Sequence, residues 1–314
     1  MKFIELFAGI GGFRYGLEMC RKQEPIGKRT IGECVPPKRD ISISNVRGRK
    51  SESQEGHRLL NGVYTCVWAN EIDKYACQIY RKNFGEEELY EGDITKVNTD
   101  DIPDFDLLTG GFPCQSFSIA GKRRGFDDTR GTMFFEIERI CRAKKPRLIL
   151  LENVKGLLSH NSGQTFQTIL KILSDIGYVL QWQVLNSKNF GVPQNRERVF
   201  IIGHLRGTSR PKVFPIGCSN EAHIKYTTMS RQQQDRTVSP EGISPCLASN
   251  TTFDKWNIDN ETHIRRLTPT ECERLQGFPD GWTEGVSDTQ RYKALGNAVT
   301  TNVITEIGKR IANV

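Results

Sequence analysis

The stretch KFIELFAGIGGF, residues 2–13, says most about the fold of this chain. Residues 3–7 have the apolar composition of a buried strand, and helical spacing runs from about residue 13 to residue 20. The glycines between them let the backbone turn tightly and approach a ligand, as in the first turn of nucleotide-binding folds. The alternative is that the glycines serve only a tight turn. In either case the stretch predicts a strand, a glycine-rich turn and a helix.

The alternation of strand-like and helix-like segments continues over most of the first 205 residues. Further strands are predicted at residues 63–69, 105–108, 148–151, 179–185 and 199–203. Helices are predicted at residues 73–84, 134–144, 165–175, 268–276 and 299–312. This order of elements predicts an α/β fold in which a mostly parallel sheet carries helices on both faces.

Residues 207–264 differ from the rest because they are polar, irregular and rich in Pro, Gly, Ser and Thr. A structureless connection of that length is uncommon in a compact protein, so a small loop-rich domain is favoured over a linker. The predicted division is a main domain of residues 1–206 and 280–314, with residues 207–279 as the small domain and its hinge.

The formal net charge of +7 fits a polyanionic partner without proving one. Residues 21–60 hold ten Lys/Arg and five Asp/Glu, so this segment alone contributes +5. A solvated surface is the usual meaning of such a run, and contact with nucleic acid is the less common one. No run of 18 apolar residues predicts a membrane-spanning helix, and the N-terminus lacks the features of a signal peptide.

Nine cysteines are scattered without a C-x-x-C pair or a histidine cluster, so no metal site is expected. Unpaired thiols suit a reducing cytosol, and most are expected to be buried and inert. Cys114 differs because Gly and Pro flank it just after a predicted strand, where ligands bind in open α/β sheets. An exposed thiol with a lowered pKa at that place is a competent nucleophile.

Charged side chains lie at the ends of other predicted strands. Glu71 is placed to accept hydrogen bonds from ribose hydroxyls, and Asp93 to meet an adenine amino group, so together they favour an adenosine-type ligand. Glu152 follows the strand at residues 148–151, near the Cys114 loop if those strands are neighbours. Arg196 and Arg198 alternate along an extended segment and therefore point to one side, where a forked donor suits phosphate or a carbonyl oxygen.

These features belong to nine ordered blocks that resemble the bacterial-type cytosine-C5 DNA methyltransferases. The blocks are FAGIGGFR at 7–14, NEID at 70–73, GDI at 92–94, GGFPCQSFS at 110–118, GFDDTRGTMFF at 125–135, ENVKG at 152–156, QNRERVFIIG at 194–203, RRLTPTECERLQGFP at 265–279 and GNAVTTNV at 296–303. The resemblance covers nearly the whole chain, except residues 21–62 and much of 207–264.

The resemblance implies a Rossmann-like domain that transfers a methyl group from S-adenosylmethionine to C5 of a cytosine flipped out of double-stranded DNA, with S-adenosylhomocysteine as product and no metal. Cys114 would add to C6, Glu152 would hold and protonate the N3 edge, and Arg198 would contact the cytosine carbonyl. Arg196 would support the thiolate and nearby backbone. The methyl-donor pocket is implied at Phe7, Ile10, Gly12, Glu71, Ile72, Asp93, Ile94, Pro113, Met133, Asn297 and Ala298.

The resemblance also implies a biological setting. The enzyme is expected to be a monomer in the bacterial cytosol, associated with the nucleoid, with no membrane partner. It is expected to be the modification enzyme of a restriction-modification system, beside a cognate endonuclease that acts separately. Residues 207–279 would form the target-recognition domain, and residues 115–131 resemble the mobile loop that closes over the flipped base.

Two departures from the family pattern stand out. Residues 21–62 insert roughly thirty extra residues. They are expected to form a disordered or peripheral element at the edge of the sheet away from the active site, and one hypothesis is that they add nonspecific phosphate contacts. Where relatives carry a Thr-Leu pair, this chain has Cys246-Leu247, with Thr237-Val238 as the other possible equivalent.

Two alternative functions remain. An RNA cytosine methyltransferase shares these blocks, but its Cys-Phe-Thr signature is missing here. A catalytically inactive DNA-binding relative would have no chemical reason to keep Cys114, Glu152, Arg196 and Arg198 together.

Overall fold

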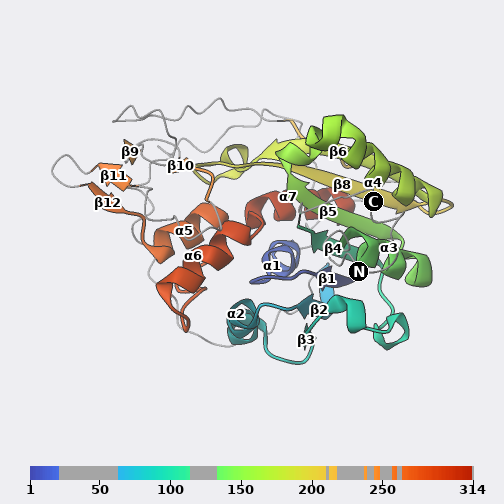
Figure 1. Ribbon diagram of the computed structural model, residues 1–314, viewed down its shortest axis with the longest axis horizontal. Helices are drawn as coiled ribbons and strands as arrows, with labels where there is room; N and C mark the ends of the chain where they lie inside the picture. Colours follow the sequence, from blue (N-terminus) through green and yellow to red (C-terminus); the bar gives the residue numbers. More distant parts are fainter. Residues whose placement is uncertain are drawn as a thin grey trace, which may run out of the picture.

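A computed structural model describes residues 1–20, 63–113, 133–209, 212–217, 237–238, 244–247, 257–259 and 264–312. At its centre is a seven-stranded sheet with the order β3-β2-β1-β4-β5-β8-β6 (Figure 1). The strands are β1 (Lys2–Leu6), β2 (Thr65–Glu71), β3 (Leu89–Glu91), β4 (Leu107–Gly111), β5 (Leu148–Val154), β6 (Tyr178–Asn186) and β8 (Glu197–Leu205). Only β8 runs antiparallel to its neighbours in this sheet, so the predicted mostly parallel α/β fold is confirmed.

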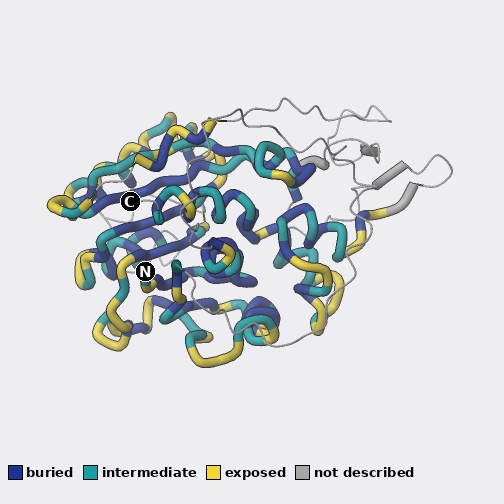
Figure 2. The backbone as a smooth tube through the Cα atoms, turned by 180° about the vertical axis from the view of Figure 1, so that it is seen from behind, coloured by how far each residue is buried: buried dark blue, intermediate teal, exposed yellow. Residues whose placement is uncertain are grey.

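Side chains that alternate along the strands divide the core into two layers. Phe3 and Leu107 face a cluster built with α1 and α7, whereas Ile4 and Leu108 face a cluster built with α3 and α4. The helices are α1 (Gly12–Glu18), α2 (Lys74–Phe84), α3 (Met133–Lys144), α4 (Gln164–Asp175) and α7 (Thr301–Ala312). The strands are accordingly buried in the middle of the molecule, and exposed residues gather in the connections (Figure 2). Burial on both faces explains why the inner strands β1, β4, β5 and β8 are mostly apolar.

A third cluster joins α2 to the C-terminal helices α5 (Pro269–Gln276) and α6 (Asp288–Asn297). Trp282 belongs to it and donates from its indole nitrogen to the carbonyl of Ile10, at 3.0 Å. This bond ties the C-terminal helices to the glycine-rich turn. Two small sheets are formed by short strands. They are β7 (Gln194–Asn195), just before β8, and, beyond β8, β9 (Thr237–Val238), β10 (Ser244–Pro245), β11 (Asn257–Asp259) and β12 (Ile264–Arg266).

Several elements differ from the sequence-based expectation. β5 extends to Val154 and β8 begins at Glu197, so Glu152 and Arg198 lie inside strands, not beside them. The cause is pairing, because Glu152 lies opposite Phe200 and Val154 opposite Arg198 in the antiparallel ladder. Strand β3 was implied only by the strand end at which Asp93 was placed, and helix α6 was not predicted, since neither has a clear apolar pattern.

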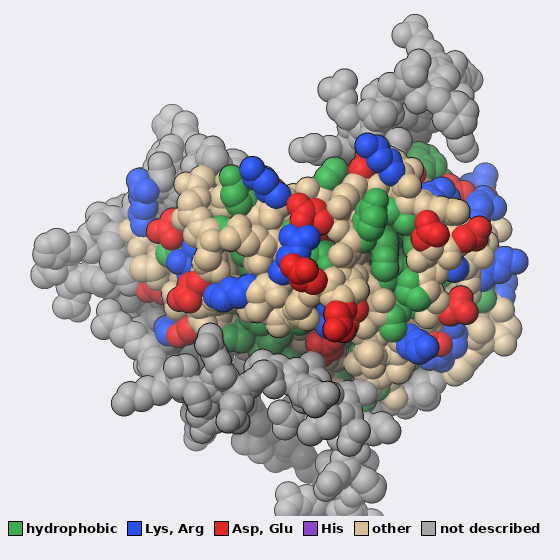
Figure 3. Space-filling view, turned by 90° about the horizontal axis from the view of Figure 1, so that it is seen from below, with side chains coloured by type: hydrophobic (Ala, Val, Ile, Leu, Met, Phe, Trp, Pro, Cys, Tyr) green, Lys and Arg blue, Asp and Glu red, His purple; other side chains and the backbone are tan. Residues whose placement is uncertain are grey.

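The surface of the described residues mixes both signs of charge. Figure 3 shows Lys and Arg interspersed with Asp and Glu on the face that lies below in Figure 1. On α2, Arg81 forms an ion pair with Glu91 at 2.6 Å. None of the described helices is long and apolar enough to cross a membrane.

Helices α1 and α7 approach each other closely at glycines. A Cβ added at Gly16 would lie 2.6 Å from Cβ of Ile304 and 2.8 Å from the carbonyl oxygen of Thr301. Close helix packing of this kind leaves no room for a side chain.

Gly16→Ala is therefore expected to lower the free energy of unfolding by about 1–3 kcal/mol, despite the better helix propensity of alanine. Denaturant unfolding monitored by circular dichroism measures this loss. Gly156→Ala is the matched control, because a Cβ at Gly156 meets nothing within 4 Å. Equal midpoints for the two variants would contradict the packing argument.

Candidate active site

A cavity of about 1070 Å³ opens at the carboxyl ends of β1, β2, β4 and β5. Most of the described residues predicted from the sequence line it. They are Phe7, Gly12, Glu71, Ile72, Pro113, Met133, Glu152, Arg196, Arg198, Asn297 and Ala298. Segments far apart in the chain thus meet at one edge of the sheet, as parallel strands require.

Three predicted pocket residues are not in the lining. Ile10 and Ile94 are almost fully buried in hydrophobic clusters. The Asp93 carboxylate accepts a hydrogen bond from the backbone nitrogen of Thr95, and bonding to Thr95 lowers its pKa. Contact of these three residues with a ligand stays a prediction.

Glu71 forms one end of the cavity. Its Oε2 accepts from the backbone nitrogen of Gly9 at 2.7 Å, and its Oε1 accepts from the nitrogens of Ile72 and Asp73, both at 2.8 Å. Three backbone donors hold the carboxylate in one orientation and leave it able to accept further hydrogen bonds. The side chain of Ile72 beside it is 67% exposed, which leaves an apolar surface for a ring to cover.

Glu5, on β1, fixes the turn that precedes α1 by hydrogen bonds. Its role was not predicted from the sequence. Its Oε1 accepts from the backbone nitrogens of Phe13 and Arg14, at 3.0 and 3.4 Å. Burial raises the pKa of Glu5 to about 8, against the opposing charge of Arg14. The available signal was an acidic residue within an apolar strand, directly before the glycine-rich turn.

The turn also needs glycine for its backbone. Gly11 has φ +81°, and a Cβ there would lie 2.2 Å from the Phe84 ring. Phe7 has a φ of +54°, which is unusual for a residue with a side chain and places local strain at the cavity wall.

Glu152 and Arg198 form the other end of the cavity. Arg198 Nε lies 3.0 Å from Glu152 Oε1 in a largely buried ion pair. Burial raises the pKa of Glu152, whereas the charges of Arg198 and Arg196 oppose that rise. A Cβ at Gly111 would lie 3.2 Å from Glu152 Oε2, so bare backbone at the end of β4 makes room for the carboxylate.

Asn153 was also missed, although its block was recognised. It is 3% exposed, and its Nδ2 donates to the carbonyl of Phe112 at 2.9 Å. This bond ties the end of β5 to the chain just before Pro113, which lines the cavity.

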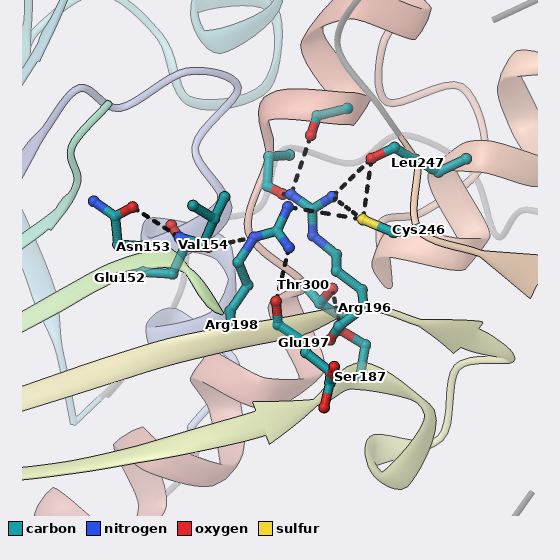
Figure 4. Close-up of polar contacts among 12 residues, drawn as sticks. Glu152, Asn153, Val154, Ser187, Arg196, Glu197, Arg198, Cys246, Leu247 and Thr300 are labelled. Atoms are coloured by element: carbon teal, nitrogen blue, oxygen red, sulfur yellow. Dashed lines mark hydrogen bonds and ion pairs between the residues drawn. The ribbon is translucent and has the colours of Figure 1, made fainter. Parts of the chain in front are cut away.

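Arg196 is 2% exposed and holds three segments together (Figure 4). Nη1 donates to Leu247 O at 3.0 Å and to Cys246 Sγ at 3.2 Å. Nη2 donates to the carbonyls of Gly296 and Ala298, at 3.0 and 2.8 Å. Arg196 thus positions backbone around the cavity.

Cys114 itself, the predicted loop at residues 115–131 and the insert at residues 21–62 lie outside the described residues. Five of the described cysteines are buried, and burial raises their thiol pKa. They are Cys20, Cys66, Cys77, Cys141 and Cys272. Among the described cysteines, only Cys246 is partly exposed, and it lines the cavity. The described part of the chain holds no cluster of His, Cys, Asp and Glu that could bind a metal ion.

Comparison with known proteins gives the class of this fold and site. The family model for C-5 cytosine-specific DNA methylases matches residues 53–239 and 218–313. The Type II methyltransferase M.NlaX from Neisseria lactamica is 37% identical over 99% of this chain and 96% of its own length. The Type II methyltransferase M.HhaI from Haemophilus parahaemolyticus is 34% identical over 100% of this chain and 94% of its own length.

Solved structures agree on the fold. The Dnmt2 methyltransferase from S. pombe superimposes with a TM-score of 0.69 at 21% identity, covering 100% of this chain and 98% of its own. The chain therefore belongs to the C-5 cytosine-specific DNA methylase family. It is a DNA (cytosine-5-)-methyltransferase, as the order of its sequence blocks predicted.

Proposed function

We propose that this enzyme methylates C5 of a cytosine flipped out of double-stranded DNA, with S-adenosylmethionine as donor and Cys114 as covalent nucleophile. One observation carries the proposal: a single cavity is lined by Glu71 and Ile72 at the end of β2 and by Glu152 and Arg198 on β5 and β8, with β1 and β4 between them in the sheet. Pro113 lies on its wall, and the chain continues from there to Cys114.

The residues of the cavity suit each chemical step. The Cys114 thiolate adds to C6 of the cytosine, while Glu152 gives a proton or hydrogen bond to N3. Arg198 donates to the cytosine carbonyl and offsets the charge that develops in the ring. Carbon C5 then takes the methyl group, whose bond to the sulfonium sulfur of the donor breaks. A base removes the C5 proton, the C5–C6 double bond forms again, and the Cys114 thiolate leaves C6.

The Glu71 end of the cavity fits the donor. The carboxylate of Glu71, fixed by three backbone nitrogens, retains lone pairs for ribose hydroxyls. The exposed Ile72 side chain suits an adenine ring, and Phe7, Gly12, Met133, Asn297 and Ala298 complete the wall. Bound S-adenosylmethionine supplies an electrophilic methyl group, and S-adenosylhomocysteine is the product.

The proposed substrate is duplex DNA read by residues 207–279. Chemistry on a paired base requires its extrusion into the cavity, which costs a few kcal/mol of lost pairing and stacking. Because the relatives are Type II methyltransferases, we propose that the enzyme protects DNA in a restriction-modification system, as a monomer in the bacterial cytosol beside a separate endonuclease.

Covalent trapping tests the proposal without knowledge of the target sequence. A long duplex of mixed sequence, with every cytosine replaced by 5-fluorocytosine, is incubated with enzyme and S-adenosylmethionine. Fluorine at C5 cannot leave as a proton does, so a denaturation-resistant adduct is expected with the natural chain and none with Cys114→Ser.

The unsubstituted duplex and an RNA of the same sequence that carries 5-fluorocytosine serve as controls. No adduct with the duplex, or an equal adduct with Cys114→Ser, would contradict the covalent mechanism. An adduct with RNA only would select the RNA-methylating alternative.

A further inference from the structure

The short segment 244–247 is docked onto the active site by its backbone. β10 pairs in parallel with β7, with Ser244 opposite Gln194. The fully buried Gln194 side chain accepts from the Leu247 nitrogen at 3.1 Å and donates to the Leu275 carbonyl at 2.8 Å. Arg196 adds its bond to the Leu247 carbonyl. These bonds fix the backbone on both sides of Cys246.

Docking places the Cys246 sulfur within reach of two guanidinium groups (Figure 4). Arg196 Nη1 donates to it at 3.2 Å, and Arg198 Nη2 donates to it at 3.7 Å. The thiol in turn donates to the Leu247 carbonyl at 3.3 Å. The polarisable sulfur of Cys246 is therefore a shared acceptor for two cationic groups.

Cys246 also completes the set of contacts around Arg198. Each nitrogen of that guanidinium has a partner: Nε pairs with Glu152, Nη1 donates to the Glu197 carbonyl, and Nη2 donates to Cys246. Three contacts on three different atoms define the plane of the group. Without the sulfur, Arg198 loses its contact at Nη2.

We propose that Cys246 is a positioning residue that holds the Arg198 guanidinium against Glu152 once segment 244–247 has docked. The proposal rests on the function proposed for Glu152 and Arg198. Segment 244–247 of the proposed target-recognition domain thereby contributes to the catalytic arrangement. Cys246, outside the central sheet, sets the geometry of Glu152 and Arg198 within it.

The test compares Cys246→Ala, Cys246→Ser and Cys246→Thr in the full chain, by transfer of a labelled methyl group to genomic DNA. Cys246→Ala removes the acceptor, so kcat is expected to fall by about 5- to 20-fold while the affinity for S-adenosylmethionine is unchanged. Serine and threonine keep a hydroxyl acceptor and are expected to restore most of the loss.

The pH profile separates positioning from general packing. A cation near Glu152 favours its charged form, so a loosened Arg198 raises the pKa of Glu152 further. The pH at which activity is lost on the alkaline side is therefore expected to move upward in Cys246→Ala. Cys141→Ala controls for lost packing, because it removes a buried thiol on α3, outside the cavity. Its kcat and pH profile are expected to be unchanged.

Two results would overturn the proposal: a Cys246→Ala enzyme with the natural kcat and pH profile, or an effect confined to KM for DNA. Methyl transfer is measured independently of trapping, so the covalent mechanism is judged separately. The natural chain could form no adduct while Cys246→Ala still lowers kcat and shifts the pH at which activity is lost. That result would support positioning by Cys246 and contradict nucleophilic attack by Cys114.

Discussion

Glu152→Gln is expected to lower kcat by about 10²- to 10⁴-fold, with the affinity for S-adenosylmethionine nearly unchanged. The amide keeps the shape of the carboxyl group but cannot give up or take a proton at N3. It also leaves Arg198, 3.0 Å away, without its counter-charge. Methyl transfer under saturating conditions measures kcat, and calorimetric titration measures cofactor affinity at the other end of the cavity.

The pH profile adds a second readout to this variant. Burial raises the pKa of Glu152, so its protonated form persists to higher pH than that of an exposed glutamate. A rate that depends on the protonated acid falls as the pH rises through this raised pKa. Glu152→Gln has no such group, so the fall in rate that this acid causes at high pH is expected to be absent from its pH profile.

Glu197→Gln provides the matched control. Glu197 is one residue from Arg198 on the same strand, but its side chain is 42% exposed and pairs with Lys155 at the surface. Its backbone carbonyl, which Arg198 uses, is unaffected by the change. Near-natural kcat is expected for this variant. A similar fall in both variants would show that charge near Arg198, and not the acid at N3, matters.

Arg196→Met is expected to lower the free energy of unfolding by about 3–5 kcal/mol and to abolish methyl transfer. Methionine keeps the apolar part of the side chain and removes every donor. The carbonyls of Leu247, Gly296 and Ala298 would each lose a bond to Arg196 in a buried place. Denaturant unfolding measures the loss.

Arg142→Met is the comparison for this second variant. Arg142 is 58% exposed and pairs with Glu138 one turn earlier on α3, so its removal is expected to cost about 0.5 kcal/mol or less. An Arg196→Met protein that unfolds at the natural denaturant concentration would refute the role of Arg196 as the link between the three segments.

Much of the fold could be predicted from local pattern. The alternation of Phe3 and Ile4 toward opposite clusters, and the glycine-rich turn before α1, follow from residues adjacent in the chain. The reversed direction of β8 did not follow, because an apolar run has the same pattern in either direction. Helix α6 was missed because the apolar face of Asp288–Asn297 is weakly marked.

The sequence by itself determined the strand–turn–helix start and the types of chemical group available, because these depend on residues close together in the chain. The order of its blocks along the chain determined the family. Tertiary structure alone decided which groups meet. Arg196 bonds to carbonyls 51, 100 and 102 residues away, and Cys246 reaches Arg198 across 48 residues. Periodicity reports only on neighbours within a few positions, whereas such contacts depend on how whole segments pack against each other.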